Sequence, residues 1–409
     1  MHVRGIPMYP KADSINRPGH KIGLSHDEIK RYSRHLIMPE VGVVGQKKLK
    51  AARVLMVGAG GLGSPLGIYM AAAGVGCLGI VDYDTVDLSN LQRQVLHGTA
   101  DVGRPKTESA LDRLRDINSH IHIDIYNKPL TSENAREIVE QYDLVVDGTD
   151  NFPTRYLIND VCVFTRKHFI FGGIFRFYGQ ASVFCDREGP CYRCLFPFPP
   201  PADSVPSCAE GGVLGILPGT IGTIQATEAI KLILGIGDSL VGRLLNYNAL
   251  EMDFSLFDIK KDPGCPVCGD QPSIKELIDY EEFCGMPAHD RSSWVASAES
   301  IGATSITPKQ LKRRIEGDKP ICLLDVREPH ELEISRIREA ASINIPHYQV
   351  IERMNELDTS QDIVVFCRFG LQSLKVIREL KKHGFKKLYN LEGGINRWAH
   401  EIDNSLPLY

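Results

Sequence analysis

A cysteine follows an apolar run in the stretch IVVFCRFGLQS, Ile363 to Ser373. The apolar residues predict a buried strand, and the short loop after Cys367 contains one glycine. A sulfur in this position could be a nucleophile, or it could be a packing residue at the end of a strand. This stretch taken alone leaves both interpretations open.

Four other cysteines form two Cys-x-x-Cys pairs, Cys191 with Cys194 and Cys265 with Cys268. Each pair is next to turn residues, and four thiolates suit a closed tetrahedral zinc site. Two redox pairs or a chance spacing are the alternatives. A site with four protein ligands has no open position, so we expect a structural Zn²⁺ that adds folding free energy.

Cys208 lies in a third setting, the proline-rich segment FPFPPPADSVPSCAEGG at residues 196–212. The run of prolines excludes a helix or a central strand and predicts an exposed loop. Such a loop is a poor place for a packing cysteine. It suits a nucleophile that must travel, so we expect a chemical role for Cys208.

The glycine-rich stretch GAGGLG, residues 58–63, follows an apolar run and precedes a helical pattern. Glycines let the backbone approach a phosphate, and the helix N-terminus supplies N–H donors. Asp82 ends the next apolar run, where a ribose-binding carboxylate is expected. These features fit an NAD enzyme and a nucleoside-triphosphate enzyme equally well, and a purely structural turn is the third interpretation.

Polar residues beyond the second strand favour the triphosphate. DLSNLQRQ places Asn90, Gln92 and Arg93 there, and Lys106 opens the next helix. Asp150 follows the fourth strand. Cationic side chains can neutralise a triphosphate and a carboxylate can hold Mg²⁺, whereas a dehydrogenase needs neither. Each charge singly could be a surface salt bridge, but all of them are predicted at strand ends.

The elements that position these residues alternate along the chain. Strands are predicted at RVLMV, CLGIVDYD, HIDIYN and DLVVDGTDN, with helices between them, which indicates an α/β fold with a mostly parallel sheet. A second, smaller α/β unit begins near Thr304 and includes strands at ICLLDVRE and DIVVFC. Ligands in such sheets bind at the carboxyl ends of the strands.

Length and composition define the broad class. The chain has 409 residues and a net charge of −4, which predicts several soluble domains and argues against a nucleic-acid partner. No segment suits a transmembrane helix, so no membrane partner is expected. Eleven cysteines without a secretory signal indicate a reducing, cytoplasmic location. We expect a flexible leader at 1–24, domains at 25–270 and 304–409, and a linker at 271–303.

From about Ser25 to Asp270, the motifs GAGGLGS, DYDTVDLSNLQRQ, GRPKTESA and DGTDN resemble the MoeB/ThiF family, the adenylyltransferases related to ubiquitin-activating enzymes. The resemblance implies a Rossmann-like adenylation domain that uses ATP and Mg²⁺. Its substrate would be the C-terminal glycine of a ubiquitin-like sulfur-carrier protein of the MoaD/ThiS type, ending in Gly-Gly. The two Cys-x-x-Cys pairs also match this family.

The resemblance implies a set of site residues. Arg93 would be catalytic, Asp150 would hold the metal, and Arg34 would reach the site of the partner subunit in a homodimer. The implied cofactor-binding residues are Gly60, Gly61, Asp82, Ser89, Asn90, Leu91, Gln92, Arg93, Lys106, Asp150, Asn151 and Arg34.

From about Thr304 to Tyr409, the stretches LLDVREPHELEISRIREAASINIP, VVFCRFGLQS and YNLEGGINRW resemble a rhodanese domain. The resemblance implies that Cys367 carries a persulfide in a loop whose N–H groups bind anions. One departure is Gln372, where such loops commonly have arginine. Ser373 stands where a phosphatase loop of the Cys-x5-Arg type needs its arginine, which excludes that activity.

The fusion of both domains resembles the MoeZ/MOCS3/Uba4-type proteins. We therefore expect ATP-dependent adenylation of the carrier, followed by sulfur transfer from the Cys367 persulfide, which a cysteine desulfurase or another donor supplies. Cys208 would resolve the acyl disulfide. The alternatives are a rhodanese-like module that only docks partners, and an NAD-dependent oxidoreductase with structural zinc. The pathway stays open among molybdenum cofactor, thiamin, tRNA thiolation, cysteine and natural-product synthesis.

Overall fold

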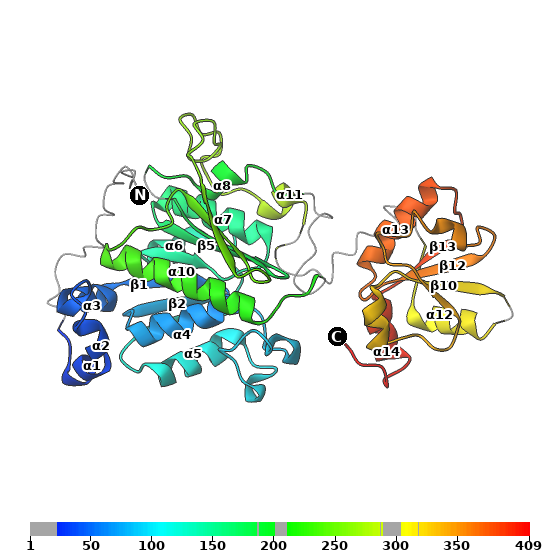
Figure 1. The fold of residues 1–409 in the computed structure, drawn as a ribbon, viewed down its shortest axis with the longest axis horizontal. Helices are drawn as coiled ribbons and strands as arrows, with labels where there is room; N and C mark the ends of the chain where they lie inside the picture. Colours follow the sequence, from blue (N-terminus) through cyan, green and yellow to red (C-terminus); the bar gives the residue numbers. More distant parts are fainter. Residues whose placement is uncertain (1–22, 186–187, 201–210, 287, 289–303, 318) are drawn as a thin grey trace. The chain divides into compact units, whose positions relative to one another are not determined.

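The computed structural model describes residues 23–185, 188–200, 211–286, 288, 304–317 and 319–409. Two compact units divide the chain, Met1–His289 and Asp290–Tyr409 (Figure 1). Cys208 lies outside the described residues. Among the described helices, none is long and apolar enough to cross a membrane.

The first unit contains an eight-stranded sheet of order β3-β2-β1-β4-β5-β6-β7-β8. The first five strands in this order are parallel, and the last three pair antiparallel, so the expected mostly parallel sheet is confirmed. The strands are β1 (Arg53–Val57), β2 (Cys77–Val81), β3 (His122–Tyr126), β4 (Leu144–Asp147), β5 (His168–Phe175), β6 (Tyr178–Phe184), β7 (Arg243–Asn248) and β8 (Asp253–Asp258).

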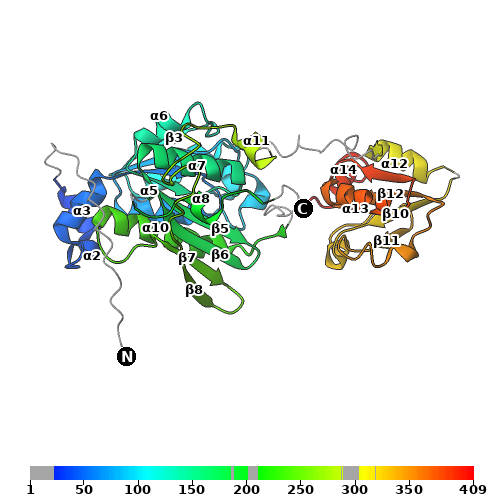
Figure 2. The ribbon, with the colours of Figure 1, turned by 90° about the horizontal axis from the view of Figure 1, so that it is seen from above.

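Alternating residues of the central strand β1 belong to separate hydrophobic cores on the two faces of this sheet. In β1, Val54 and Met56 belong to one core, and Leu55 and Val57 to the other. The first core is shared with α3 (Gly42–Ala51), α4 (Gly63–Ala73), α5 (Lys106–Ile117) and α10 (Ile216–Leu234). The second is shared with α6 (Ala135–Glu140), α7 (Phe152–Thr165), α8 (Tyr192–Leu195) and α11 (Tyr280–Cys284). Figure 2 shows α7 and α11 on one side of the sheet and α10 on the other.

Short helices precede the sheet, α1 (His26–Arg31) and α2 (Ser33–Leu36). Ser25 caps α1, because its hydroxyl accepts the Glu28 N–H while the Glu28 carboxylate accepts the Ser25 N–H.

Part of the predicted linker at 271–303 belongs to the first unit. The helix α11 packs on α7, and its Tyr280 and Cys284 side chains are buried. Ser132 donates to the carbonyl oxygen of Ile278. In α11 the buried residues Tyr280 and Cys284 lie one helical turn apart and form a short apolar face. This pattern is too short to predict a helix from the sequence.

The second unit is a parallel five-stranded sheet of order β11-β10-β12-β13-β9. In β12, Ile363 and Val365 share a core with α13, and Val364 and Phe366 share one with α14. Cys367, the next residue after β12, belongs to the same core as Ile363 and Val365. The elements are β9 (Thr304–Ile306), α12 (Pro308–Ile315), β10 (Ile321–Asp325), η4 (Pro329–Glu333), β11 (Ser342–Asn344), β12 (Asp362–Phe366), α13 (Leu371–Lys382), β13 (Leu388–Leu391) and α14 (Gly394–Glu401).

Candidate functional site

A cavity of about 420 Å³ opens at the carboxyl ends of the parallel strands. Val57 at the end of β1 is in register with Val81 of β2 and Asp147 of β4, so the loops after these strands meet. The predicted residues that line the cavity are Gly60, Gly61, Asp82, Ser89, Asn90, Arg93, Lys106, Asp150 and Asn151. Pro129 and Leu130, after β3, add apolar surface.

The glycine turn is shaped by backbone crowding. Gly58 has φ of +99°, and a Cβ there would lie 2.7 Å from the carbonyl oxygen of Gly148. A Cβ on Gly63 would lie 2.1 Å from the Gly58 carbonyl oxygen. Only glycine fits either position, and the tight turn aims the N-terminus of α4 at the cavity, where it favours phosphate.

Asp82 binds the glycine turn through a backbone N–H group. Its Oδ2 accepts the Ala59 N–H at 2.7 Å, and its Oδ1 accepts the Asp84 N–H at 2.9 Å. Burial raises the pKa of the Asp82 carboxyl, while nearby Lys106 and the hydrogen bonds oppose that rise. The same carboxylate that lines the cavity therefore also fixes the position of the glycine turn.

The cationic side chains lie at the cavity with partners from neighbouring loops. Lys106 Nζ is 2.7 Å from Asp84 Oδ2, and Arg93 donates to the Ser89 carbonyl oxygen at 3.1 Å. The lysine side chain is buried, whereas that of Asp84 is half exposed. A triphosphate entering the cavity would meet both cations at the edge where the parallel strands end.

After β4, Asn151 and Asp150 both line the cavity but differ in their hydrogen bonds. Asn151 Oδ1 accepts the Thr154 N–H at 2.9 Å and so caps α7. The exposed Asp150 carboxylate makes no hydrogen bond or ion pair with any other described residue, and it lines the cavity. A free carboxylate beside a phosphate site fits Mg²⁺, which prefers oxygen ligands.

Three predicted nucleotide-binding residues lie elsewhere. Leu91 and Gln92 do not line the cavity, and Gln92 instead lies against Gly215, where a Cβ would be 2.5 Å from its Oε1. Arg34 is exposed on α2 and also lies apart from the cavity of its own chain. Their roles stay predictions.

The structure adds residues that sequence reasoning missed. Gln94 and Thr154 line the cavity, and the buried Gln94 Oε1 and Thr154 Oγ1 have no hydrogen-bond partner. An unpaired buried polar atom is costly, which makes both available to a bound substrate. Gln94 stands in the quoted motif DLSNLQRQ, so its signal was present. Nothing in the sequence distinguished Thr154 from any other residue in the first turn of a helix.

The paired cysteines meet in the first unit. The four sulfurs of Cys191, Cys194, Cys265 and Cys268 all lie within 4.8 Å of one another. Sγ–Sγ distances are 3.5 Å for Cys191–Cys265 and 3.4 Å for Cys194–Cys268. Tetrahedral zinc with bonds of about 2.3 Å spaces its sulfurs by about 3.8 Å, so these donors can hold Zn²⁺ after small shifts. The Asp262 N–H, donating to Cys194 Sγ at 3.4 Å, supports a thiolate there.

In the second unit, Cys367 begins the loop between β12 and α13. Its sulfur accepts the Gly370 N–H at 3.1 Å and lies 3.6 Å from Ser373 Oγ. The Ser373 hydroxyl donates to Asn390 Oδ1 at 2.6 Å. With only 2% of its surface exposed, Cys367 is held by the loop backbone at the N-terminus of α13, where a backbone N–H group faces its sulfur.

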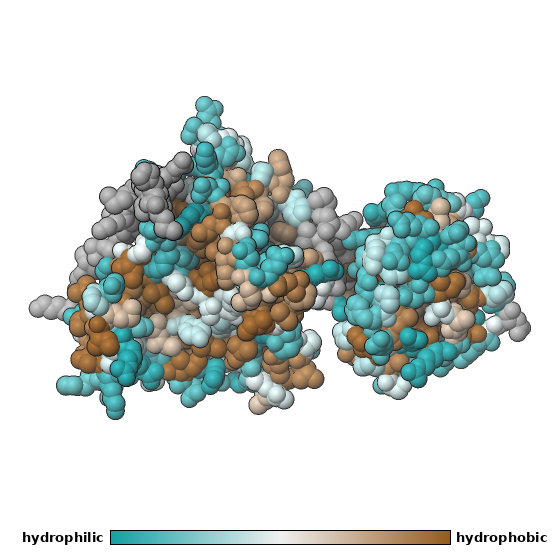
Figure 3. Space-filling model, in the orientation of Figure 1, coloured by the Kyte–Doolittle hydropathy of each residue, from teal (hydrophilic) through white to brown (hydrophobic). Residues whose placement is uncertain are grey.

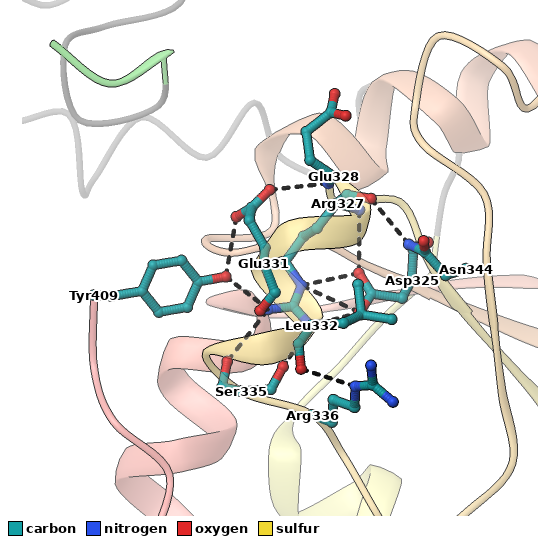
Figure 4. Close-up of polar contacts among 9 residues, drawn as sticks. All are labelled: Asp325, Arg327, Glu328, Glu331, Leu332, Ser335, Arg336, Asn344 and Tyr409. Carbon is teal, nitrogen blue, oxygen red and sulfur yellow. Dashed lines mark hydrogen bonds and ion pairs between the residues drawn. The ribbon is translucent and has the colours of Figure 1, made fainter. Parts of the chain in front are cut away.

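The first turn of α14, which begins at Gly394, binds this loop through two backbone hydrogen bonds. The Ile395 N–H donates to the Cys367 carbonyl oxygen at 2.9 Å, and the Asn396 N–H to that of Arg368 at 3.2 Å. Next to this contact, Arg327 forms a buried ion pair with Asp325 at the end of β10 (Figure 4). The loop is thus fixed on the side of α14 by two backbone hydrogen bonds.

Comparisons with known proteins match each of the two units to a family. Residues 32–267 match the ThiF family, and residues 307–401 match the Rhodanese-like domain. The probable adenylyltransferase/sulfurtransferase MoeZ of Mycobacterium tuberculosis is 47% identical over 390 residues, covering 94% of this chain and 96% of that protein. The adenylyltransferase and sulfurtransferase MOCS3 of Drosophila ananassae is 43% identical over 401 residues, covering 94% and 86%.

Among solved structures, E. coli MccB with ATP has a TM-score of 0.52 and 24% identity, covering 58% of this chain and 73% of that one. At this identity the likeness shows the fold alone.

Proposed function

Because the chain belongs to the ThiF family and carries a rhodanese-like domain, we propose that it adenylates a ubiquitin-like sulfur carrier and then sulfurates it. The observation that carries the proposal is the presence in one chain of a cavity with a glycine turn, two cations and a free carboxylate, and of the Cys367 loop. The family assignment replaces the alternative of an NAD-dependent oxidoreductase.

In the first reaction, the C-terminal carboxylate of a carrier ending in Gly-Gly attacks the α-phosphorus of ATP, and pyrophosphate leaves. The glycine turn and the start of α4 would hold phosphate oxygens, while Lys106 and Arg93 offset the negative charge that develops. Asp150 is the residue that would hold Mg²⁺, which supplies further charge neutralisation when bound. The protein contributes position and charge, not a covalent step.

In the second reaction, the outer sulfur of a Cys367 persulfide attacks the acyl carbon of the adenylate and displaces AMP. The product is an acyl disulfide on Cys367. The Cys208 thiolate then attacks the Cys367 sulfur, releases the carrier thiocarboxylate and leaves a Cys208–Cys367 disulfide. A cellular thiol reduces that disulfide, and a cysteine desulfurase or a similar donor restores the persulfide.

The zinc site would have a structural role in this scheme. Its ligands come from α8 and from a turn near residue 265, segments well separated along the chain. Four sulfur ligands leave no position for a substrate, so a bound Zn²⁺ would hold the two segments together and take no part in the reaction.

We further propose a homodimer built on the N-terminal helices. Large apolar side chains are exposed there, with Ile37 72% and Val44 71% accessible, and Met38 and Val43 beside them in sequence. Figure 3 shows hydrophobic surface over this region at the lower left. Exposed apolar patches of this kind mark protein interfaces. Arg34 lies on α2 within the same segment, which would let it reach the cavity of a partner subunit.

A different surface suits the carrier. The edge strand β8 and the turn before it expose the side chains of Leu250, Met252, Phe254, Leu256 and Phe257. An apolar edge of a sheet is a common docking surface for a small folded partner. We propose that the carrier lies here and extends its C-terminal tail to the cavity.

The test combines the carrier, ATP, Mg²⁺ and a persulfide source, with intact-mass measurement of the carrier. The mass gain of one oxygen-to-sulfur replacement is expected with the unmodified chain. Cys367→Ala should keep carrier-dependent pyrophosphate exchange and lose thiocarboxylate. Cys322→Ala, a partly buried cysteine of the same unit, should keep both.

Thiocarboxylate formed by Cys367→Ala from the persulfide source would overturn the sulfur-transfer step. If instead the unmodified chain adenylates the carrier but Cys367 acquires no persulfide, the rhodanese-like unit is a docking module. If the carrier gives neither product, the proposal fails for that carrier, and the carriers of the other candidate pathways are compared in the same assay.

A further inference from the structure

Tyr409, in the same unit as the Cys367 loop, points its hydroxyl toward Arg327 and Glu331 (Figure 4). Its hydroxyl accepts a hydrogen bond from Arg327 Nη1 at 2.6 Å and donates to Glu331 Oε1 at 3.0 Å. Burial raises the pKa of the Tyr409 phenol to about 12, so the hydroxyl remains a donor at neutral pH. The phenol is therefore attached at its oxygen to two charged side chains.

The attachment point is itself rigid. Arg327 is 1% exposed, and its Nε donates to Asp325 Oδ1 at 2.9 Å, while its Nη2 donates to the Ser335 carbonyl oxygen at 3.0 Å. The Val326 N–H donates to the Phe366 carbonyl oxygen at 3.0 Å, one residue before Cys367. The oxygen end of Tyr409 is thus tied to the same strand end from which the Cys367 loop starts.

The remainder of Tyr409 contacts the loop. The Arg368 guanidinium carbon is 5.4 Å from the centre of the Tyr409 ring and 4.7 Å from that of Phe369. The carbonyl oxygen of Tyr409 accepts from Asn396 Nδ2 at 2.9 Å, and the Asn396 N–H binds the Arg368 carbonyl oxygen. Both ends of Arg368, its carbonyl and its guanidinium, are therefore linked to Tyr409.

Arg368 is well placed to meet an anion. It is the one cation in the loop CRFGLQ, because Gln372 stands where an arginine is common in such loops. Its guanidinium makes no hydrogen bond or ion pair with any residue that the structure describes, and is held only by the two aromatic faces. Stacking on aromatic rings orients a guanidinium while leaving its N–H groups free.

We propose that Tyr409 is a positioning residue that holds Arg368 at the rim of the Cys367 loop, where the guanidinium recognises the anionic group of the reagent that reaches the sulfur. The inference rests on the proposed function only in taking Cys367 as the reacting sulfur. Arg368 thereby supplies the charge that Gln372 does not, and Tyr409 determines where that charge stands.

The experiment compares alkylation of Cys367 in the full chain by iodoacetate, which is anionic, and by iodoacetamide, its neutral counterpart. Peptide mass spectrometry gives both rates. Arg368→Leu and Tyr409→Leu should each lower the ratio of the iodoacetate rate to the iodoacetamide rate by about fivefold, the scale of one partly exposed charge interaction. Tyr409→Phe keeps the ring and should show a smaller loss. The rate with iodoacetamide should stay unchanged in all three.

The double variant Arg368→Leu with Tyr409→Leu should show no further loss, because Tyr409 acts through Arg368. Tyr348→Leu is the matched control: Tyr348 also binds a glutamate of this unit, Glu328, at 3.4 Å, and its loss should leave the ratio unchanged.

An equal fall of both rates in Tyr409→Leu would mean a purely structural role and overturn the inference. An unchanged ratio would also overturn it, as would a Cys367 that neither reagent modifies. The carrier thiocarboxylate assay reports separately on the proposed function, which survives the loss of anion preference.

Discussion

Arg193 and Asp160 form a doubly hydrogen-bonded ion pair inside the first unit. Arg193 Nε lies 2.9 Å from Asp160 Oδ1, and Nη2 lies 2.8 Å from Oδ2, with both side chains fully buried. Tyr280 of α11 donates to the same carboxylate at 2.9 Å. Since Arg193 stands between Cys191 and Cys194, two members of the four-cysteine cluster, this pair joins the cluster, α7 and α11.

Breaking this pair should be costly. Asp160→Asn leaves the buried guanidinium without its counter-charge, and we expect a loss of about 3–5 kcal/mol in the free energy of unfolding of the first unit. Denaturant titration would measure it. The matched control is Arg104→Met in the same unit, which removes an arginine that pairs with Asp101 and Asp112 but is 40% exposed. That variant should leave the free energy of unfolding nearly unchanged, because exposed ion pairs contribute little, and a similar loss in both would contradict the assigned role.

His97 should make the stability of the first unit depend on pH. Its Nε2 donates to the Ala59 carbonyl oxygen at 3.0 Å, so its Nδ1 accepts from Ser109 Oγ at 2.8 Å, and the ring is neutral. Burial, assisted by Lys106 and opposed by Asp82 and Asp101, lowers the pKa of His97 below its ordinary value of 6.5.

The unfolded chain therefore binds a proton at a higher pH than the folded chain does. The stability contribution of His97 is complete above pH 6.5 and falls as the pH drops from there toward the lowered pKa. His97→Gln should flatten the unfolding free energy over that interval, whereas exposed His26→Gln should leave the wild-type slope. An unchanged slope in His97→Gln would show that another group is responsible.

Removal of zinc should destabilise the first unit and spare the second. Cys265→Ser, or a strong chelator, should lower the melting temperature of the first unit, because metal binding contributes folding free energy. Elemental analysis should give one zinc per wild-type chain and none in the variant. Cys284→Ala is the control, since burial raises the pKa of that thiol to about 12 and it belongs to no group of metal-ligand side chains among the described residues. Full zinc content in Cys265→Ser would refute the site.

Substituting two glycines of the second unit should distinguish the cost of a positive φ from the cost of crowding at the Cβ position. Gly384 has φ of +91° and open space at its Cβ position, so Gly384→Ala should cost only about 1–2 kcal/mol. Gly394 has φ of +60°, but a Cβ there would lie 2.3 Å from the Cys367 carbonyl oxygen and 2.5 Å from that of Arg368. Gly394→Ala should cost more and abolish thiocarboxylate formation. Equal activity in the two variants would mean that the contact with the loop is dispensable.

Much of the fold could be predicted because it depends on local patterns. Continuous apolar runs specified the buried strands, and the glycine stretch specified a turn into α4. The spacing of the cysteines predicted a four-sulfur cluster, which the structure assembles. The helix α11 escaped prediction, since its short apolar face has meaning only against α7.

The sequence by itself determined which residues follow the parallel strands, since strand direction and crossover rules bring those loops to one edge. Only the tertiary structure decided which of them share the cavity. It placed Asn90, Arg93 and Gln94 there but left out Leu91 and Gln92, although all stand in one motif. It also brought Tyr409 to Arg368, a contact between distant segments that no local pattern records. Strand register and side-chain packing set such contacts, and both depend on the whole core.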